Sequence, residues 1–316
     1  MKISVLVPTY RRPRDLRRCL LALRAQARPA DEVIVVVRDG DAETRSALAG
    51  FDPGALPLKR VTVNVPGVVA AMTAGMDAAD GDIVALTDDD AAPRPDWLTR
   101  IEAHFRADAW VGGVGGRDLV YHNGRLEEGD CRTVGQVQWF GRVIGNHHLG
   151  VGPARQVDVL KGVNCAYRTE TLRQVGFESR LLGDGAQVHW ELCLGLGIAR
   201  RGWKMIYDPA ILVDHHPAQR FDEDQRGGLH QEAHRRAVHN ETLALMTHLP
   251  PWRRLVYAGY ALAIGTRESP GFLHLFRLLA SRDRDVLPRF SATLRGRAAG
   301  LRASFFRQSC EFRSEH

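Results

Sequence analysis

Short apolar runs alternate with amphipathic stretches along the first third of the chain, and polar residues follow the apolar runs directly. The apolar runs predict buried strands, at residues 3–7, 32–37, 58–63 and 82–86. The stretches between and after them predict helices, at about 14–26, 41–50, 67–79 and 96–106. Strands that alternate with helices in this way predict a mostly parallel sheet with helices on both faces.

The rest of the chain is less regular. Glycines are concentrated between residues 112 and 116, and residues 121–155 resemble an irregular insertion. Further elements are expected after it: strand-like structure at 157–168, a helix at about 188–201, a short strand at 203–207, and a helix at 228–249. The tail that follows contains more helices.

Polar residues stand at the ends of three separate predicted strands. Thr9 and Tyr10 follow the first strand, Asp39 follows the second, and residues 88–90, three consecutive aspartates, follow the fourth. In parallel sheets, ligands bind outside the carboxyl ends of the strands. We therefore expect these side chains to meet at one edge of the sheet and to form a binding site there.

Asp88, Asp89 and Asp90 are the clearest chemical signal in the sequence. Adjacent carboxylates repel one another unless a positive charge neutralises them, and Mg²⁺ and Mn²⁺ prefer oxygen ligands. In an extended turn, Asp88 and Asp90 point the same way while Asp89 points elsewhere. We expect Asp90 to bind a divalent cation, while Asp88 contacts the cation or a ribose. The alternative is a solvated loop or a helix cap, but a cap needs only one aspartate.

Six segments resemble, in their order and spacing, those of the family 2 glycosyltransferases. They are Ile3–Tyr10, Asp31–Asp39, Gly67–Asp82, Ile83–Asp90, Leu160–Arg168 and Glu191–Pro209. The resemblance, which covers about residues 1–217, implies an α/β fold of the GT-A type with a Rossmann-like, mostly parallel sheet and helices on both faces. The pattern of the tail adds a C-terminal helical extension. The expected catalytic domain is 1–217, with a nucleotide-sugar half at 1–110 and an acceptor half at 111–217, and the basic helical extension is 218–316.

The same resemblance implies a nucleotide-diphospho-sugar donor, most commonly a UDP-sugar, and inverting transfer to a glycan or a lipid-linked glycan. The residues that it assigns to donor binding are Pro8, Thr9, Tyr10, Asp39, Asp88 and Asp89. Asp88 and Asp90 would form the metal-binding motif. A downstream histidine would complete the metal shell, and His215 is better placed for this than His216. The implied cofactor is Mn²⁺ or Mg²⁺, and a histidine ligand favours Mn²⁺.

The general base is less well defined by the sequence. Family members carry an acidic pair at the start of the helix near 188–201, but Val188 and His189 stand in its place. Glu191 is our first choice for the base, and Asp184 and His189 are the alternatives. The residues expected on the acceptor side are Asn164, Arg168 and Trp190. In the insertion, His147 and His148 either line an acceptor pocket or lie in a surface loop. Trp139 and Phe140 either stack on a sugar ring or pack in the core.

Positive charge is concentrated in the tail. Residues 251–316 contain twelve arginines and five acidic residues, a net charge of +7, which leaves −1 of the total of +6 for the rest of the chain. The segment at 252–265 is apolar after a basic start, and aromatic and leucine residues follow at helical spacing. One interpretation is that these helices lie on the inner membrane surface near a lipid-linked acceptor. The alternative is that they pack on the catalytic domain.

Composition and motifs limit the partners, the cellular location and the alternative functions that the sequence allows. No nucleic-acid motif accompanies the basic tail, so we expect no nucleic-acid partner. The five cysteines are scattered and odd in number, which predicts reduced thiols, and no signal peptide or spanning segment is recognisable, so we expect a cytoplasmic protein. The alternative functions are nucleotidyl transfer, which usually needs a glycine-rich basic loop near the N-terminus, and non-catalytic nucleotide-sugar binding.

Overall fold

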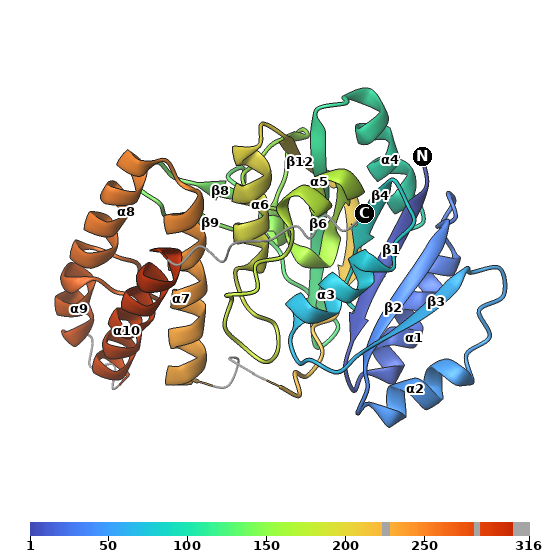
Figure 1. Ribbon diagram of the computed structural model, residues 1–316, viewed down its shortest axis with the longest axis horizontal. Helices are drawn as coiled ribbons and strands as arrows, with labels where there is room; N and C mark the ends of the chain where they lie inside the picture. The colour runs from blue at the N-terminus through green and yellow to red at the C-terminus, as the bar shows by residue number, and fades with distance from the viewer. Residues whose placement is uncertain (223–227, 281–284, 306–316) are drawn as a thin grey trace, which may run out of the picture.

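Figure 1 shows a computed structural model of the chain, which describes residues 1–222, 228–280 and 285–305. The strands are β1 (Ile3–Thr9), β2 (Glu32–Arg38), β3 (Leu58–Val63), β4 (Ile83–Leu86), β5 (Ala91–Pro93), β6 (Val111–His122), β7 (Arg125–Leu126), β8 (Gln136–Val137), β9 (Val143–Ile144), β10 (Arg155–Gln156), β11 (Cys165–Arg168) and β12 (Lys204–His215). The helices are α1 (Pro13–Arg24), α2 (Ala42–Ala49), α3 (Val68–Asp77), α4 (Trp97–Ala107), α5 (Thr169–Val175), α6 (Trp190–Arg200), α7 (Gln231–His248), α8 (Pro251–Ala263), α9 (Phe272–Leu279) and α10 (Val286–Phe305).

One large mixed sheet organises the fold, with the strand order β10-β12-β6-β11-β4-β1-β2-β3. The half built from β3, β2, β1 and β4 is entirely parallel, and β6 and β12 are parallel to each other. Between these two halves, β11 runs antiparallel to both β4 and β6. The predicted mostly parallel sheet is confirmed. The antiparallel β11 joins the two halves, and the predicted strand at 157–168 is shorter than expected.

Helices cover both faces of the sheet because residues on each strand alternate between the two faces. On β1, Val5 and Val7 belong to the core shared with α1 and α4. Leu6, on the opposite face, packs in a second core with α3 and α6. The central strands are buried on both sides, which explains why their sequences are continuous apolar runs.

The glycine-rich segment forms the first half of β6, where the sequence predicts no strand. Glycine has low strand propensity, so the pattern gives no strand signal there. The reason for these glycines is close packing: a Cβ on Gly116 would overlap the backbone carbonyl of Ile211, and one on Gly113 would lie 2.9 Å from Cδ1 of Tyr167. β12 also continues past its predicted end to His215, with a register shift between Asp208 and Leu212.

The C-terminal helices extend the molecule at the end away from β1–β3 (Figure 1). α7 packs against α6, and α10 packs against α7, so these two tail helices pack on the part of the molecule that contains the sheet, which is the second of the two arrangements predicted. None of the helices that the structure describes is both long and apolar enough to cross a membrane. The four described cysteines are unpaired, and Cys310 lies outside the described residues. The domain boundaries given above stay a prediction.

The buried side chain of Asn164 joins helix α4 to strands β6 and β12. Its Oδ1 accepts a hydrogen bond from Trp97 Nε1 at 2.8 Å, and its Nδ2 donates to the carbonyls of Ile211 at 2.9 Å and Arg117 at 3.1 Å. We predict that Asn164→Ala lowers the free energy of unfolding by about 2–4 kcal/mol, because it leaves several buried polar groups unpaired. Urea denaturation measures this.

The control is Gln174→Ala, which removes an exposed amide from α5 and should change the unfolding free energy by less than about 0.5 kcal/mol. An Asn164→Ala variant as stable as this control would show that the buried amide does not hold the sheet together.

Candidate active site

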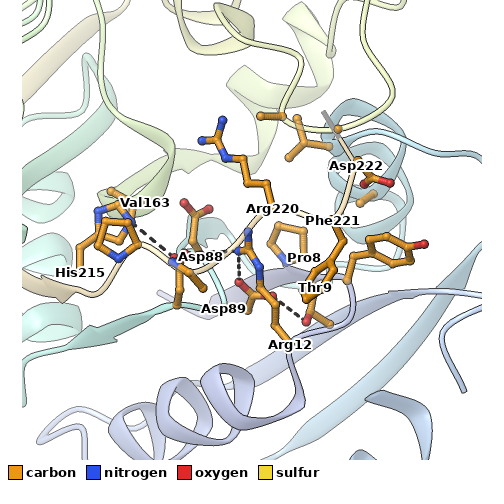
Figure 2. Close-up of a pocket in the computed structure, with 18 of the residues that line it drawn as sticks. Pro8, Thr9, Arg12, Asp88, Asp89, Val163, His215, Arg220, Phe221 and Asp222 are labelled. Carbon is orange, nitrogen blue, oxygen red and sulfur yellow. Dashed lines mark hydrogen bonds and ion pairs between the residues drawn. The ribbon is translucent and has the colours of Figure 1, made fainter. Parts of the chain in front are cut away.

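A cavity of about 510 Å³ opens at the carboxyl ends of β1 and β4, and residues of the segment that follows β12 also line it (Figure 2). Several of the residues predicted to bind ligands line it, although they are far apart in the sequence. The charged and polar lining residues are Thr9, Tyr10, Arg12, Arg38, Asp88, Asp89, Asp90, His122, Glu127, His148, Lys161, Glu191, His215, Arg220 and Asp222. The expected convergence of strand-end residues is therefore observed for β1 and β4.

Asp89 is held by β1 and the start of α1. Its carboxylate accepts a hydrogen bond from Thr9 Oγ1 at 2.7 Å and pairs with Arg12 Nη1 at 2.9 Å. Arg12 immediately precedes α1 and also reaches Asp90 Oδ2 at 3.3 Å. Asp88, by contrast, points into the open space of the cavity, as does Arg220 (Figure 2). The middle aspartate therefore braces the loop.

Asp88, Asp90 and His215 come together as a potential metal site. One ligand atom from each lies within 4.8 Å of the others. Asp90 Oδ1 faces His215 Nε2 at 3.5 Å, and Asp90 Oδ2 accepts the backbone N–H of Ala218 at 2.9 Å. Two carboxylates and an imidazole suit Mn²⁺ and, with less preference for the histidine, Mg²⁺. The donor set therefore fits the predicted cation.

Burial raises the pKa values of the three aspartates, whereas nearby positive charges lower them. Burial raises the pKa of Asp88 to about 6 and the pKa of Asp89 to about 7. Burial alone would raise the pKa of Asp90 too, but the hydrogen bond and charge of His215 lower it to about 2. For His215, burial opposes the charged form, yet Asp118 and Asp90 raise its pKa to about 9. The cluster concentrates negative charge that a divalent cation would neutralise.

Asp118, on β6, holds His215 from the side away from Asp90. It is fully buried, and its Oδ2 lies 3.2 Å from His215 Nδ1 and 2.5 Å from Lys161 Nζ. In the neutral ring, donation from Nδ1–H to Asp118 leaves Nε2 free to bind a metal, an arrangement common around metal-binding histidines. Lys161 compensates the charge of Asp118, so the histidine is oriented by a paired carboxylate.

Glu191 is the one of the three predicted bases that lines the cavity. It lies in the first turn of α6 and faces the backbone N–H of Gly162 at 3.4 Å, and burial raises its pKa. Asp184 is exposed and pairs with Arg236 at 3.0 Å outside the cavity. His189 precedes α6 with a left-handed backbone (φ 76°) and also lies outside the lining. The geometry therefore favours Glu191 over its alternatives.

The predicted donor-binding residues separate into two groups. Pro8, Thr9 and Tyr10 line the cavity, and the Arg38 guanidinium lies 4.0 Å from the centre of the Tyr10 ring. Asp39 is exposed, pairs with Arg45 at 3.3 Å and is not among the lining residues. Its neighbour Arg38 takes the place facing the cavity, because successive strand residues point to opposite sides.

The placement of the predicted acceptor residues does not support ligand contact. The Asn164 amide is fully buried in the sheet. Arg168 lies at the opposite end of β11, beside Ile83 rather than the aspartates, and donates to the carbonyls of Val111 and Phe105. Trp190 is buried against Phe177. All three use their polar or aromatic groups to hold the fold.

The histidines and aromatic residues of the insertion also separate. His148 lines the cavity, and its Nε2 lies 3.3 Å from Glu127 Oε1. His147 is buried, and burial lowers its pKa to about 4. Phe140 packs edge-to-face on Tyr260 of α8, with ring centres 4.7 Å apart, and Trp139 stays close to it. Of these four residues, His148 alone faces the cavity.

Sequence reasoning missed Arg12, Asp118 and Arg220 as site residues. Arg12 could have been found, because a buried acidic cluster needs a nearby cation and this arginine follows the first strand. Asp118 and Arg220 had no comparable signal. Asp118 lies on a strand that the glycines concealed, and Arg220 reaches the cavity only because β12 extends to His215.

Comparison with known protein families agrees with this geometry. The family model for glycosyltransferase-like family 2 matches residues 1–227. Among curated proteins, glycosyltransferase AglE of Haloferax volcanii is 26% identical over 194 residues, which is 60% of this chain and 59% of AglE. The match thus spans about three fifths of each protein.

Solved structures show the same fold. TarS of S. aureus (residues 1–349), in complex with UDP-GlcNAc, matches 93% of this chain and 80% of its own with a TM-score of 0.61 and 17% identity. The mannosyltransferase PcManGT of Pyrobaculum calidifontis, in complex with GDP-Man and Mn²⁺, matches 96% of this chain and 86% of its own with a TM-score of 0.52 and 20% identity. These likenesses confirm the predicted GT-A type fold.

If Asp118 orients His215 for a metal, Asp118→Asn should weaken Mn²⁺ binding by about 10–100-fold. Isothermal titration of the purified protein with Mn²⁺ measures this without turnover. The matched control is Asp208→Asn, which removes the carboxylate partner of His104 (2.8 Å) away from the cavity and should leave Mn²⁺ affinity unchanged.

A double variant separates orientation from a general loss of stability. In a His215→Ala background, Asp118→Asn should cause no further loss of Mn²⁺ affinity, because the two residues act through one contact. If Asp118→Asn lowers Mn²⁺ affinity equally in the presence and absence of His215, Asp118 does not act by orienting this histidine.

Proposed function

Because the chain belongs to glycosyltransferase family 2, we propose that it transfers a sugar from a nucleotide-diphospho-sugar to a glycan or lipid-linked acceptor, with inversion at the anomeric carbon. One observation carries this proposal: the potential metal ligands Asp88, Asp90 and His215 line the same cavity as Glu191 and the β1 end. A nucleotide, a cation and an acceptor hydroxyl need such a shared space. Nucleotidyl transfer has no comparable support.

Asp88, Asp90 and His215 are the residues that would hold Mn²⁺ or Mg²⁺. When bound, the cation would stabilise the negative charge that develops on the departing nucleoside diphosphate. Thr9 and Arg12 hold the carboxylate of Asp89, which leaves Asp88 as the neighbouring carboxylate available to a cation in the cavity. Arg220 also lines the cavity (Figure 2), and its positive charge would attract a diphosphate there.

Glu191 is the proposed general base. Burial raises its pKa, which brings a carboxylate closer to the basicity needed to take a proton from a hydroxyl near neutral pH. Its place in the first turn of α6 and the contact with the N–H of Gly162 position its carboxylate. The acceptor oxygen would then form its bond to the anomeric carbon as the bond to the diphosphate breaks, and Glu191 would carry the proton away.

The donor is proposed to be a UDP-sugar. Support comes from TarS, which was solved with UDP-GlcNAc, whereas PcManGT was solved with GDP-Man. In this chain, Tyr10 and Arg38 present a flat aromatic and cationic surface at the β1–β2 edge where a base would stack. Calorimetric titration with UDP and GDP, each with Mn²⁺, decides between the two nucleotides.

Metal-dependent nucleotide binding should depend on Asp90. We predict that UDP binds the wild-type protein more tightly with Mn²⁺ than without it, and that Asp90→Ala removes this gain. Calorimetry measures both affinities, and thermal melting confirms that the variant is folded. Asp80→Ala, which alters an exposed aspartate near Lys59, is the control that should keep the gain. A folded Asp90→Ala variant with full Mn²⁺-dependent affinity would contradict the metal assignment.

Catalysis should depend on Glu191. We predict that Glu191→Gln retains UDP binding with Mn²⁺ but lowers the rate of donor turnover by about 10²–10⁴-fold, because the amide cannot take the proton. The assay follows UDP release with a panel of UDP-sugars and acceptors. Asp184→Asn should remain active. An active Glu191→Gln together with an inactive Asp184→Asn would move the base elsewhere, and nucleotide binding without any wild-type turnover would indicate a binding protein.

A further inference from the structure

The outer face of α8 is apolar, although it lies on the surface and far from the cavity. Trp252, Leu255 and Leu262 are 57%, 77% and 52% exposed, and their spacing puts them on one side of the helix. Ala258 and Gly259, which complete this side, are also exposed. A surface helix normally presents its charged residues to solvent and its apolar stripe to the core.

The two arginines of α8 point toward the protein interior side of the helix, away from its apolar outer face. Arg253 donates hydrogen bonds to the backbone carbonyls of Val137 and Gln138, and Arg254 donates to the carbonyl of Leu249. On the same inner side, Tyr257 is buried in the cluster that connects α8 to α7. These bonds fix the rotation of the helix, so its apolar side cannot turn inward.

α9 continues the apolar surface. Leu273 and Phe276 are 61% and 69% exposed, while Leu275 and Leu278 on the other side are buried against α10. α8 and α9 are in contact and form the outer end of the molecule, opposite β1–β3 (Figure 1). We call the exposed side chains of Trp252, Leu255, Leu262, Leu273 and Phe276 the α8–α9 face.

Positive charge borders this face. Arg267, in the turn between the two helices, and Arg277, next to Phe276, are exposed and make no ion pair with any part of the chain that the structure describes. The segment 251–316 carries a net charge of +7. Aromatic and leucine side chains with a basic border are the combination that binds the interface of an anionic bilayer.

We propose that the α8–α9 face docks this protein on the surface of an anionic lipid bilayer. The apolar side chains enter the headgroup and upper acyl region, and the arginines contact lipid phosphates. A second copy of the chain fits this face less well, because bringing two segments of charge +7 together is opposed by repulsion. The proposal does not depend on the donor, the metal or the base.

Vesicle flotation of the full chain tests the proposal. The vesicles contain phosphatidylcholine with phosphatidylglycerol, or phosphatidylcholine alone. One variant removes the α8 contribution (Leu255→Gln with Leu262→Gln) and a second removes the α9 contribution (Leu273→Gln with Phe276→Gln). The control is Trp110→Gln, which changes a side chain that is 65% exposed at a distance from this face.

The wild-type protein and the control should bind the anionic vesicles, and the vesicles without phosphatidylglycerol should bind less. Each double variant should lower the partition coefficient by about tenfold or more, because it removes two inserted apolar side chains. UDP binding should stay at the wild-type level in every variant, since the face is remote from the cavity.

Three results would overturn the proposal. The first is a wild-type protein that does not bind anionic vesicles, and the second is folded double variants that bind as well as the control. The third is a dimer in light scattering that the α8 variant dissociates, with no vesicle binding by either protein. That result would assign the face to contact between copies of this chain.

Discussion

Three consecutive carboxylates at the tip of β4 impose the constraint on which the site depends. Buried charges are tolerated only when they are paired and hydrogen-bonded. Arg12 and Thr9 satisfy Asp89, and the backbone after β12, through the N–H of Ala218, satisfies one oxygen of Asp90. The ends of β1 and β12 and the start of α1 are thereby tied to one loop. The cavity takes its shape from this local compensation of charge.

The compensation is unequal, and this gives each carboxylate a separate role. Both oxygens of Asp89 are bound by partners inside the fold, one by Thr9 and the other by Arg12. Asp118 is neutralised by Lys161 and is left to orient His215. Asp88 lines the cavity but is largely surrounded by protein, and this burial makes its charged form costly. An added cation is therefore most stabilising beside Asp88, which is where the proposed function requires one.

The sequence predicts the parallel half of the sheet well, because buried parallel strands are continuous apolar runs with abrupt polar ends. The same signal located Asp88 and Asp90, two of the three proposed metal ligands. It failed at β6, where packing against β12 requires glycine, and Asp118 was hidden with that strand. It also misplaced Asn164, because a sequence shows that a residue is polar and not whether its partners are ligands or backbone carbonyls. Contacts between distant segments decide that question.

Helix α7 connects the other C-terminal helices to the loop that precedes Glu191, the proposed base. The buried side chain of Asn240 donates hydrogen bonds to the carbonyls of Leu182 and Val188 and accepts the N–H of Leu182. These contacts hold both ends of the loop that leads into α6 and Glu191. The other side of α7 supports α10, and its C-terminal end leads into α8. The helices that would rest on a bilayer are thus built onto the same frame that positions the proposed base, and docking would fix the orientation of the cavity relative to the lipid surface.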